Sequence, residues 1–312
     1  MPERIGPYRV VRRLGHGGMA QVLLARAVGA SGFEMHVAIK MLLPEHAHDG
    51  ELERRLIEEA KQGARLRHRN LVAVQHLGLG DEGYFVVMEH VDGSDLAALI
   101  DGAIDEAIAL AIAGEVAEAL AFVHAARDEK GRPLGLVHRD ISPSNVLLSR
   151  AGEVKLSDLG IAKATKLAET TQASLRRGKY AYMSPEQVAG KTLDARSDQF
   201  GFGILLYELL LGSRPFDGAS VIETMDNIRE ARAPAFEGLA DDVVAFLRRC
   251  LQRDPAERFV DARELLASLA MLRWSRMPIT SAELADWVLA RLETEAPAGR
   301  AIPRTRPAQE ST

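Results

Sequence analysis

Asp140, Asn145 and Asp158 are oxygen-bearing residues near the middle of the chain, in an order that suits phosphoryl transfer. A carboxylate can accept the proton of an attacking hydroxyl group, and carboxylate and amide oxygens are the ligands that hard metal ions such as Mg²⁺ prefer. The three residues stand beside two apolar segments, 137–148 and 154–160. Short apolar segments are also typical of two buried strands joined by polar turns, and this alternative stays open.

The letters of these two segments extend the pattern. The first reads VHRDISPSNVLL, and the second reads VKLSDLG. They resemble the catalytic loop and the metal-binding loop of the protein kinases, whose pattern is H-R-D-x-x-x-x-N followed by D-F-G. The resemblance implies that Asp140 is the catalytic proton acceptor. It also implies that Asn145, as a catalytic residue, and Asp158 bind Mg²⁺, with Mn²⁺ left open as the ion.

The match to the kinase pattern departs at three positions. Ile141 stands where Leu is usual, Leu159 where Phe is usual, and Ser142 where Ser/Thr kinases carry a Lys. Without that Lys, a positive charge that would balance the transferring phosphoryl group is missing. Lys179 stands where these kinases commonly carry a Thr, and we hypothesise that Lys179 is a catalytic residue whose ammonium approaches Asp140. A solvent-facing Lys179 is the alternative.

Residues 8–40 alternate apolar and polar positions as strands do, around a turn that holds Gly15 and Gly17. Glycines permit unusual dihedral angles and close backbone approach, so amide N–H groups can lie against phosphate oxygens. Such a turn taken alone is more often an ordinary hairpin. This one resembles the kinase glycine-rich loop, although Ala20 replaces its third glycine. The strand that ends at Lys40 resembles the kinase strand whose Lys contacts the α and β phosphates of ATP.

Lys40 is therefore a predicted catalytic and ATP-binding residue, and its flexible side chain needs a carboxylate to hold it in place. Residues 51–66 repeat apolar positions at helical spacing and carry two adjacent glutamates, Glu58 and Glu59. Adjacent helical residues point about 100° apart, so only one of them can face Lys40. The resemblance favours Glu59, with Glu58 as the alternative. Gly63 lowers the helix propensity, and we hypothesise that this helix is mobile.

Two further strands are predicted at 70–77 and 84–91, with a turn over 78–83 between them. The second resembles the strand and hinge that join the kinase lobes, which implies that backbone groups of Glu89 and Val91 bind the adenine edge of ATP. The other residues that the resemblance places around the nucleotide are Leu14, Gly15, Gly17, Val22, Ala38, Glu59, Met88 and Leu147.

Asp95 has two interpretations. It matches the acidic or polar position that contacts the ribose hydroxyls of ATP in the kinases. It also directly precedes a helical pattern that begins at Leu96, where Asp is a favoured N-cap residue. Both interpretations stay open.

Arg139 directly precedes Asp140, as in kinases whose activation loop is ordered by phosphorylation. A phosphate group on the segment 158–186 would pair with Arg139 through charge-assisted hydrogen bonds. The candidate acceptors of that phosphate are Thr165, Thr170, Thr171 and Ser174.

Two matches in the second half of the chain concern the scaffold. The kinase residue that matches Asp198 anchors the backbone of the catalytic loop. The letters DPAERF at 254–259 and MSPE at 183–186 match motifs whose Arg and Glu form a buried pair, here Arg258 and Glu186. The ordered series of motifs most resembles the bacterial kinases of the eukaryotic (Hanks) type.

The motifs predict an α+β fold, the two-lobed protein kinase fold. The expected parts are a kinase domain over 8–272, with a small antiparallel β-rich N-lobe with one helix at about 8–88, a hinge at 89–94 and a larger, mainly helical C-lobe at 95–272. A capping box at Thr280 and Glu283 predicts a short helical extension within 273–294. The tail 295–312, rich in Pro, Ala, Arg and Thr, is predicted to be disordered.

Composition limits the class of protein. The 312 residues are 47% hydrophobic and 27% charged, which indicates an ordinary folded globule. The net charge of −5 argues against nucleic acid as a partner. A single cysteine, Cys250, rules out an intramolecular disulfide and fits a reducing compartment. Because no signal-peptide pattern stands out, we expect a cytoplasmic protein without a membrane anchor.

The resemblance implies a serine/threonine protein kinase that transfers the γ-phosphoryl group of Mg-ATP to hydroxyls of protein substrates, including its own. A homodimer for autophosphorylation is left open. The alternative is a catalytically weak, nucleotide-binding scaffold, motivated by Ser142 and Ala20. Tyrosine specificity also stays open, because the missing Lys at position 142 is a marker of Ser/Thr kinases, whereas Pro143 favours Ser/Thr.

Overall fold

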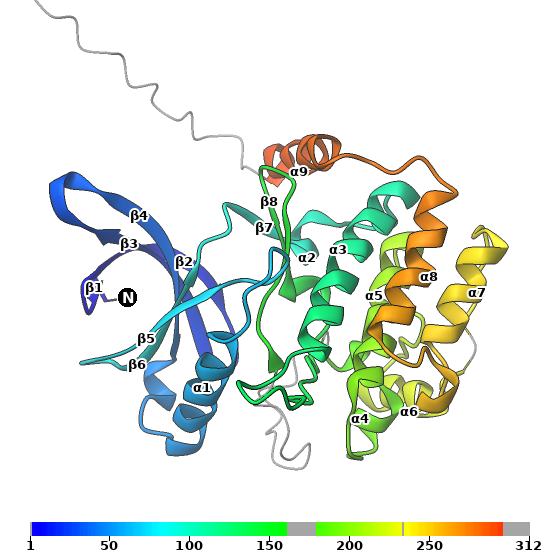
Figure 1. Cartoon of the computed structure of the whole chain (residues 1–312), viewed down its shortest axis with the longest axis horizontal. Coiled ribbons are helices and arrows are strands. Elements are labelled where there is room, and N and C mark those ends of the chain that lie inside the picture. Colours follow the sequence, from blue (N-terminus) through cyan, green and yellow to red (C-terminus); the bar gives the residue numbers. More distant parts are fainter. Residues whose placement is uncertain (1, 161–178, 233, 296–312) are drawn as a thin grey trace, which may run out of the picture.

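The chain folds into two lobes of different composition, a sheet-rich small lobe and a helical large lobe (Figure 1). The structure is a computed structural model that describes residues 2–160, 179–232 and 234–295. Short 3₁₀ helices cover Ala30–Gly32, Pro44–His46, Pro143–Asn145, Lys179–Tyr182 and Pro255–Glu257.

The small lobe is built on one antiparallel sheet with the strand order β1-β2-β3-β4-β6-β5. The strands are β1 (Arg4–Ile5), β2 (Tyr8–His16), β3 (Ala20–Val28), β4 (Glu34–Leu42), β5 (Val74–Gly80) and β6 (Gly83–Glu89). One face of the sheet buries β-branched and aliphatic side chains together with Phe85. Helix α1 (Gly50–Gly63) packs on β4, β5 and β6, and Asp49 caps its first turn. This packing sets α1 beside the strand that carries Lys40.

The turn predicted over 78–83 is shorter than expected, because β5 continues to Gly80 and only two residues separate it from β6. The reason is a tertiary contact between Gly78 and Phe85. The ring of Phe85 lies against Gly78 so closely that a side chain there would collide with it. Gly78 therefore admits an aromatic ring onto a strand and does not start a turn. The sequence prediction of a turn at this glycine was wrong.

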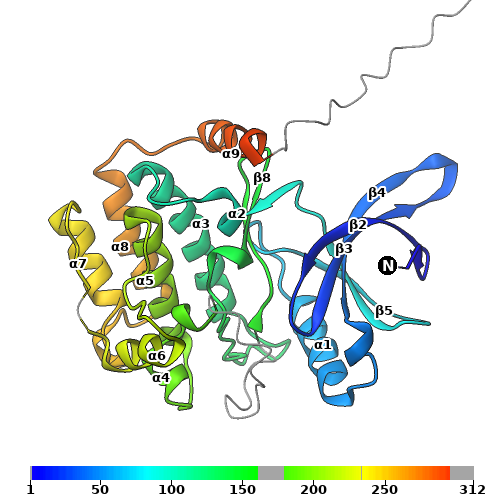
Figure 2. The ribbon, with the colours of Figure 1, turned by 180° about the vertical axis from the view of Figure 1, so that it is seen from behind.

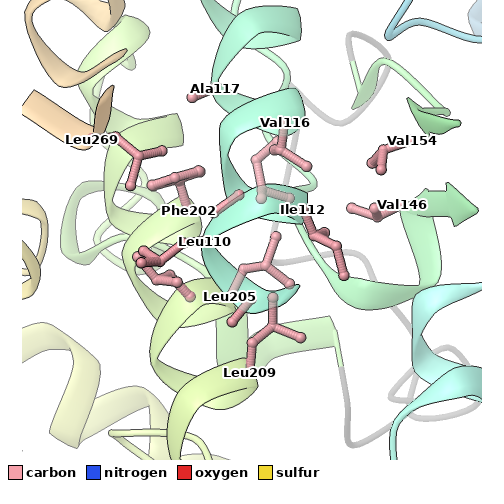
Figure 3. Close-up of a cluster of buried hydrophobic side chains, with 14 of the residues drawn as sticks. Leu110, Ile112, Val116, Ala117, Val146, Val154, Phe202, Leu205, Leu209 and Leu269 are labelled. Atoms are coloured by element: carbon pink, nitrogen blue, oxygen red, sulfur yellow. The ribbon is translucent and has the colours of Figure 1, made fainter. Parts of the chain in front are cut away.

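The large lobe is organised around two long helices, α3 (Glu106–His124) and α5 (Ala195–Leu211), whose facing side chains form its core. Figure 3 shows Leu110, Ile112, Phe202 and Leu205 within this cluster. Helix α3 is long and apolar enough to cross a membrane. Most of its apolar side chains are instead buried, and it contacts α5 and α8 (Ala262–Trp274), so the core accounts for its composition.

Smaller elements surround these helices. They are β7 (Gly93–Asp95), β8 (Val146–Ser149), β9 (Val154–Leu156), α2 (Leu96–Leu99), α4 (Pro185–Val188), α6 (Val221–Glu230) and α7 (Asp241–Cys250). The three strands form an antiparallel sheet in the order β7-β8-β9. Asn145 directly precedes β8 and Asp158 follows β9 by two residues, so this sheet joins the two loops predicted from the sequence.

The last described helix, α9 (Ser281–Glu295), lies against α2, β7 and β8 at the edge of the large lobe (Figures 1 and 2). Its first turn has the predicted capping box, because Glu283 N donates to Thr280 Oγ1 at 3.2 Å and Thr280 N donates to Glu283 Oε2 at 2.7 Å. Leu284 and Val288 are buried in the main core. The predicted tail lies outside the described residues, apart from the last residue of this helix.

Candidate active site

Lys40 of β4 joins two carboxylates from different parts of the fold. Its Nζ lies 2.6 Å from Glu59 Oε1 on α1 and 2.6 Å from Asp158 Oδ1 after β9. Glu58, the alternative partner, pairs with Lys61 at 3.0 Å. Burial alone would lower the pKa of Lys40, but the charges of Asp158 and Glu59 outweigh it and raise this pKa above its usual value. Lys40 is therefore a fixed positive charge between the two lobes.

The segment that follows β9 is seated directly on the catalytic loop. Asp158 has a left-handed φ of 55°, and Gly160 N donates to His138 O at 2.8 Å. A Cβ at position 160 would lie 2.7 Å from that oxygen, so a glycine is needed here. Leu159, at the position where kinases usually carry Phe, still packs against the main core. The unusual residue thus keeps an apolar anchor for the segment.

Asn145 connects the catalytic loop with the approach to Asp158. Its Nδ2 donates to Asp140 O at 2.7 Å, which orients the amide and leaves Oδ1 for another partner. Ser157 N donates to Asn145 O at 2.8 Å, so the residue before Asp158 is bound to Asn145. Asn145 is therefore bound directly to Asp140, and Asp158 directly follows a residue that is bound to Asn145.

Asp198 fixes the backbone of the catalytic loop. Its carboxylate accepts hydrogen bonds from His138 N and Arg139 N, both at 2.7 Å, and lies 2.7 Å from His124 Nε2. Burial alone would raise the pKa of Asp198, but the hydrogen bond with His124 helps to lower it. Arg139 has a left-handed φ of 68°, which costs free energy for a residue with a side chain. The hydrogen bonds from Asp198 stabilise that conformation just before Asp140.

The predicted pair of Glu186 and Arg258 is present and buried. Arg258 Nη1 lies 2.7 Å from Glu186 Oε1, and Nη2 lies 2.9 Å from Oε2. Ser197 Oγ also donates to Glu186 at 2.7 Å. Burial would raise the pKa of Glu186, but the hydrogen bonds from Arg258 lower it below its usual range. The pair joins the end of the 179–186 segment to the base of the large lobe.

The sheet registers bring together several residues predicted to surround a nucleotide. Three cross-strand pairs do this: Val22 with Lys40, Ala38 with Met88, and Asp95 with Leu147. Gly15 pairs with Val22 across the glycine turn, Leu14 lies beside it and is partly exposed, and Gly17 N donates to Ala20 O at 2.7 Å. The candidates from the small lobe thus share neighbouring strands, while Asp95 and Leu147 share the small sheet of the large lobe.

The hinge region limits which backbone groups can contact a base. Glu89 N already donates to Ala73 O at 2.9 Å, so a contact of Glu89 with adenine would have to use its carbonyl group. The Glu89 side chain lies 2.9 Å from Lys155 Nζ, which also donates to Arg69 O at 3.0 Å. Val91 follows in the loop between β6 and β7. Its contact with adenine stays a prediction.

Asp95 acts as the N-cap of α2, since its Oδ1 accepts a hydrogen bond from Ala98 N at 3.0 Å. Burial raises the pKa of this carboxyl group. The capping interpretation is therefore correct, and the ribose contact stays a prediction.

Several residues predicted to have a role are not among those that the structure describes. The side chain of Lys179 and the residues Thr165, Thr170, Thr171 and Ser174 lie outside the described residues. Ser142, which replaces the usual Lys, is buried, and its Oγ lies 3.1 Å from Ser144 Oγ. The hydroxyl group at this position thus serves the local structure of the loop.

Sequence reasoning missed two polar residues that support the site. His124 contacts Asp198 from the end of α3, and Lys155 contacts Glu89 from β9. Their sequence signals are weak, because a His near a helix end and a Lys within an apolar strand are more often solvated. Only the tertiary packing reveals their partners.

The donor set fits a hard divalent cation held together with phosphate groups. Among residues 2–160, 179–232 and 234–295, no group of three or more His, Cys, Asp or Glu side chains could hold a metal ion. Asn145 and Asp158 supply one amide and one carboxylate. Mg²⁺ is commonly held in this way, by one or two protein oxygens with substrate phosphates completing the shell.

Comparison with known proteins decides the family. The sequence pattern of the family described as "Protein kinase domain" matches residues 8–269. The chain belongs to the protein kinase domain family. The predicted two-lobed kinase fold is thereby confirmed. This kinase domain also resembles the Mycobacterium tuberculosis PknI kinase domain, with a TM-score of 0.61, 29% identity, and coverage of 86% of this chain and 97% of that one.

Three curated relatives of this kinase domain come from bacteria. It is 36% identical to the tyrosine-protein kinase MasK of Myxococcus xanthus over 88% of this chain and 45% of that protein. It is 33% identical to the serine/threonine-protein kinase PrkC of Bacillus subtilis, over 85% of this chain and 40% of that protein. For PknB of Mycobacterium leprae the values are 33%, 97% and 49%. The chain spans about half the length of these relatives or less.

Proposed function

We propose that this kinase domain transfers the γ-phosphoryl group of ATP to serine and threonine hydroxyls of proteins. The observation that carries the proposal is the position of Lys40 Nζ, 2.6 Å from both Glu59 and Asp158. The positive charge is thereby held next to the carboxylate predicted to bind the metal ion. Phosphoryl transfer depends mainly on such positioning and on electrostatic stabilisation.

The roles of the other residues follow from their places in the loop. Asp140 accepts or orients the proton of the attacking hydroxyl group, and its backbone oxygen is bound by Asn145. Asn145 and Asp158 would hold Mg²⁺, which would supply charge neutralisation for the phosphates. Asp198 holds the loop that presents Asp140. These assignments rest on the match to the family motif, position by position.

Phosphorylation of the chain itself is supported by two guanidinium nitrogens of Arg139. The Nε and Nη1 atoms of Arg139 are buried, and neither has a hydrogen-bond partner within the described part of the chain. A guanidinium in this state is well suited to a phosphate group, which accepts two parallel hydrogen bonds. Phosphopeptide mapping after incubation with ATP identifies which residue carries that phosphate.

The preference for serine and threonine rests on the relatives PrkC and PknB, which are named serine/threonine kinases. The relative MasK, in contrast, is named a tyrosine kinase, so the preference needs a direct test. Transfer of radiolabelled phosphate to the chain and to a generic basic protein, followed by phosphoamino-acid analysis, tests the preference. We expect label on serine and threonine. Label on tyrosine alone would contradict the specificity while leaving the kinase activity intact.

Asp140→Asn is the control for the activity itself. The amide keeps the size of the side chain but cannot accept a proton, so we expect the rate to fall by about 10²–10⁴-fold. The thermal stability and the binding of Mg-ATP should stay close to those of the wild type. A wild-type chain that binds Mg-ATP and transfers no phosphate under any of these conditions would identify a nucleotide-binding scaffold.

A further inference from the structure

A row of basic side chains crosses the sheet of the small lobe. Residues directly opposite each other on neighbouring strands project from the same face of a sheet. The register pairs Arg4 with Arg9 and Arg9 with Arg26, from β1 to β3. It continues from Arg26 to His36 on β4. The ring of His36 then meets the ring of His90, directly after β6, with 5.9 Å between the ring centroids. We name these residues the basic row.

The basic row is unfavourable for the sheet that carries it. Like charges directly opposite each other on neighbouring strands destabilise a sheet. Arg9 has such a neighbour on both sides, Arg4 on β1 and Arg26 on β3. Arg26 pairs with Glu34 at 3.1 Å, but no ion pair joins Arg4 or Arg9 to an acidic side chain of the described chain. Both residues are exposed. The fold therefore keeps a repulsive arrangement that an anion from outside would relieve.

The other charges near the basic row leave positive charge in excess. Burial lowers the pKa of His90, and the positive charges of His36 and Arg12 lower it further, against the opposite effect of Asp92. Asp92 already lies 3.7 Å from Arg150. Arg12 has no ion-pair partner among the residues that the structure describes. The chain as a whole has a net charge of −5, so this local excess of cations does not follow from the overall composition.

The basic row lies on the face of the sheet that is turned toward the large lobe. Alternate residues of a strand share a face, so His36, Ala38 and Lys40 project from the same side of β4. Lys40 contacts Asp158 of the large lobe at 2.6 Å, which identifies that side. The strands β3 and β4 extend to a hairpin that projects from the small lobe (Figure 1). A broad lipid surface suits an outer face, whereas a single helix, about 10–12 Å across, can lie along a face that looks toward the other lobe.

The spacing of the basic row indicates the form of its partner. Neighbouring strands lie about 4.8 Å apart, so the cations of the row repeat at that distance. Side chains at positions i and i+3 or i+4 of a helix are about 5–6 Å apart, whereas same-face residues of an extended chain are about 6.7 Å apart. A stripe of acidic residues on a helix therefore matches the row better than an acidic extended chain. We propose that the basic row is a docking surface for an acidic helix of a partner protein, whose carboxylates pair with Arg4, Arg9 and the neighbouring Arg12.

The docking surface is adjacent to the active site and separate from it. The row ends at His90, between Glu89 and Val91 of the hinge. None of its residues is among those assigned to phosphoryl transfer. A helix docked along the row therefore brings its protein next to the nucleotide region and leaves Lys40 and Asp158 in place.

The test measures binding of a model helix to the whole chain by fluorescence anisotropy. The probe is a labelled alanine-rich peptide with glutamates in one stripe, held helical by a staple on its opposite face. An isomer with the same glutamates spread around the helix is the control. We expect the striped peptide to bind about fivefold more tightly or better, with an affinity that falls as salt is added. Equal affinity of the two peptides, or no binding of either, would overturn the proposal. Binding to phosphatidylglycerol vesicles without binding to the peptide would assign the row to a membrane and also overturn it.

Two charge reversals on one strand locate the surface. Arg9→Glu places a negative charge in the centre of the row and should weaken binding of the striped peptide by about tenfold or more. Arg13→Glu makes the same change of net charge on β2, but Arg13 lies opposite Leu23, which is buried on the other face of the sheet. This control should bind nearly as the wild type does. Unchanged binding in Arg9→Glu, or an equal loss in both variants, would overturn the site.

The strain in the row is measured separately, by the melting temperature of the unbound chain. Arg9→Thr removes the repulsion toward Arg4 and Arg26, so it should raise the melting temperature by about 1–3 °C more than Arg13→Thr does. A lower melting temperature in Arg9→Thr would show that the row stabilises the sheet, and the reason for an outside anion would be lost. These readouts use binding and stability alone, so they are independent of whether the domain transfers phosphate.

Discussion

The small lobe and the large lobe each hold a carboxylate system against positive charge, and the two systems differ in burial and in partners. In the small lobe, Lys40 faces Glu59 and Asp158, and the side chain of Asp158 is 36% exposed. In the large lobe, Asp198 is 1% exposed and binds two backbone amides, and Arg258 is fully buried against Glu186. The Lys40 system joins three separate segments of the chain. In the large lobe, Asp198 fixes the catalytic loop, and Arg258 with Glu186 fixes the segment beneath that loop.

The difference in burial indicates that the Lys40 system binds a ligand, whereas the Asp198 and Arg258 system stabilises the fold. A charged group that binds a ligand must be reachable by the ligand, so its partners leave part of it open to solvent. A charged group that fixes a backbone is most effective when it is dry and fully hydrogen-bonded. Breaking the buried system should therefore cost stability, and breaking the open one should cost activity.

Arg258→Met should give the largest change in stability. The substitution leaves Glu186 buried without its partner, which typically costs about 3–5 kcal/mol of unfolding free energy. Urea unfolding measures the loss, and Arg253→Met, at an exposed position in the neighbouring loop, is the control. A loss below about 1 kcal/mol would remove the distinction between the two systems.

Lys40→Met should give the opposite result. We expect kcat/KM to fall by about 10²–10³-fold, because a preorganised charge next to the phosphates is lost. The free energy of unfolding should change less than in Arg258→Met, because the side chains of Glu59 and Asp158 are 20% and 36% exposed, whereas that of Glu186 is 7% exposed. Steady-state kinetics and urea unfolding of the same preparation measure both quantities. A variant that loses several kcal/mol of unfolding free energy and keeps its kcat/KM would reverse the comparison.

Lys179→Ala tests whether Lys179 supplies the positive charge that a Lys at position 142 would supply in other kinases. If it does, turnover should fall by about 10²-fold while the affinity for ATP persists. Lys191→Ala, a few residues beyond the same segment, is the matched control. Full activity in Lys179→Ala would leave the solvent-facing alternative.

Acidification should lower the stability of the fold through the buried imidazole of His138. Burial lowers the pKa of His138, so the unfolded chain binds a proton near pH 6.5 that the folded chain resists. This contribution to stability is complete above pH 6.5 and is lost as the pH falls below it, by up to about 2 kcal/mol at pH 5. His68 and His90, whose pKa values burial also lowers, act in the same direction. Melting temperatures between pH 7 and pH 5 measure the loss, and His138→Asn should flatten the slope.

The sequence predicted the residues that belong to family motifs, including the distant pair of Arg258 and Glu186, and failed where no motif specifies the partner. The choice of Glu59 over Glu58 required the family pattern together with helical geometry, and the structure has the Glu59 contact. The role of Gly78 was misread, because only the position of Phe85 explains it. The contact of His124 with Asp198 could not be predicted, since no local pattern records which side chain a helix end will meet.

The packing of α9 has a practical consequence for where the chain can be cut. Leu284 and Val288 fill part of the main core, and α9 contacts β8, the strand that carries Leu147. A fragment truncated at residue 269, where the family match stops, would lose these two side chains, each worth about 1.5–3 kcal/mol when fully buried. An expression boundary at or beyond residue 295 keeps α9, and with it the contact of α9 with the strand β8 that carries Leu147.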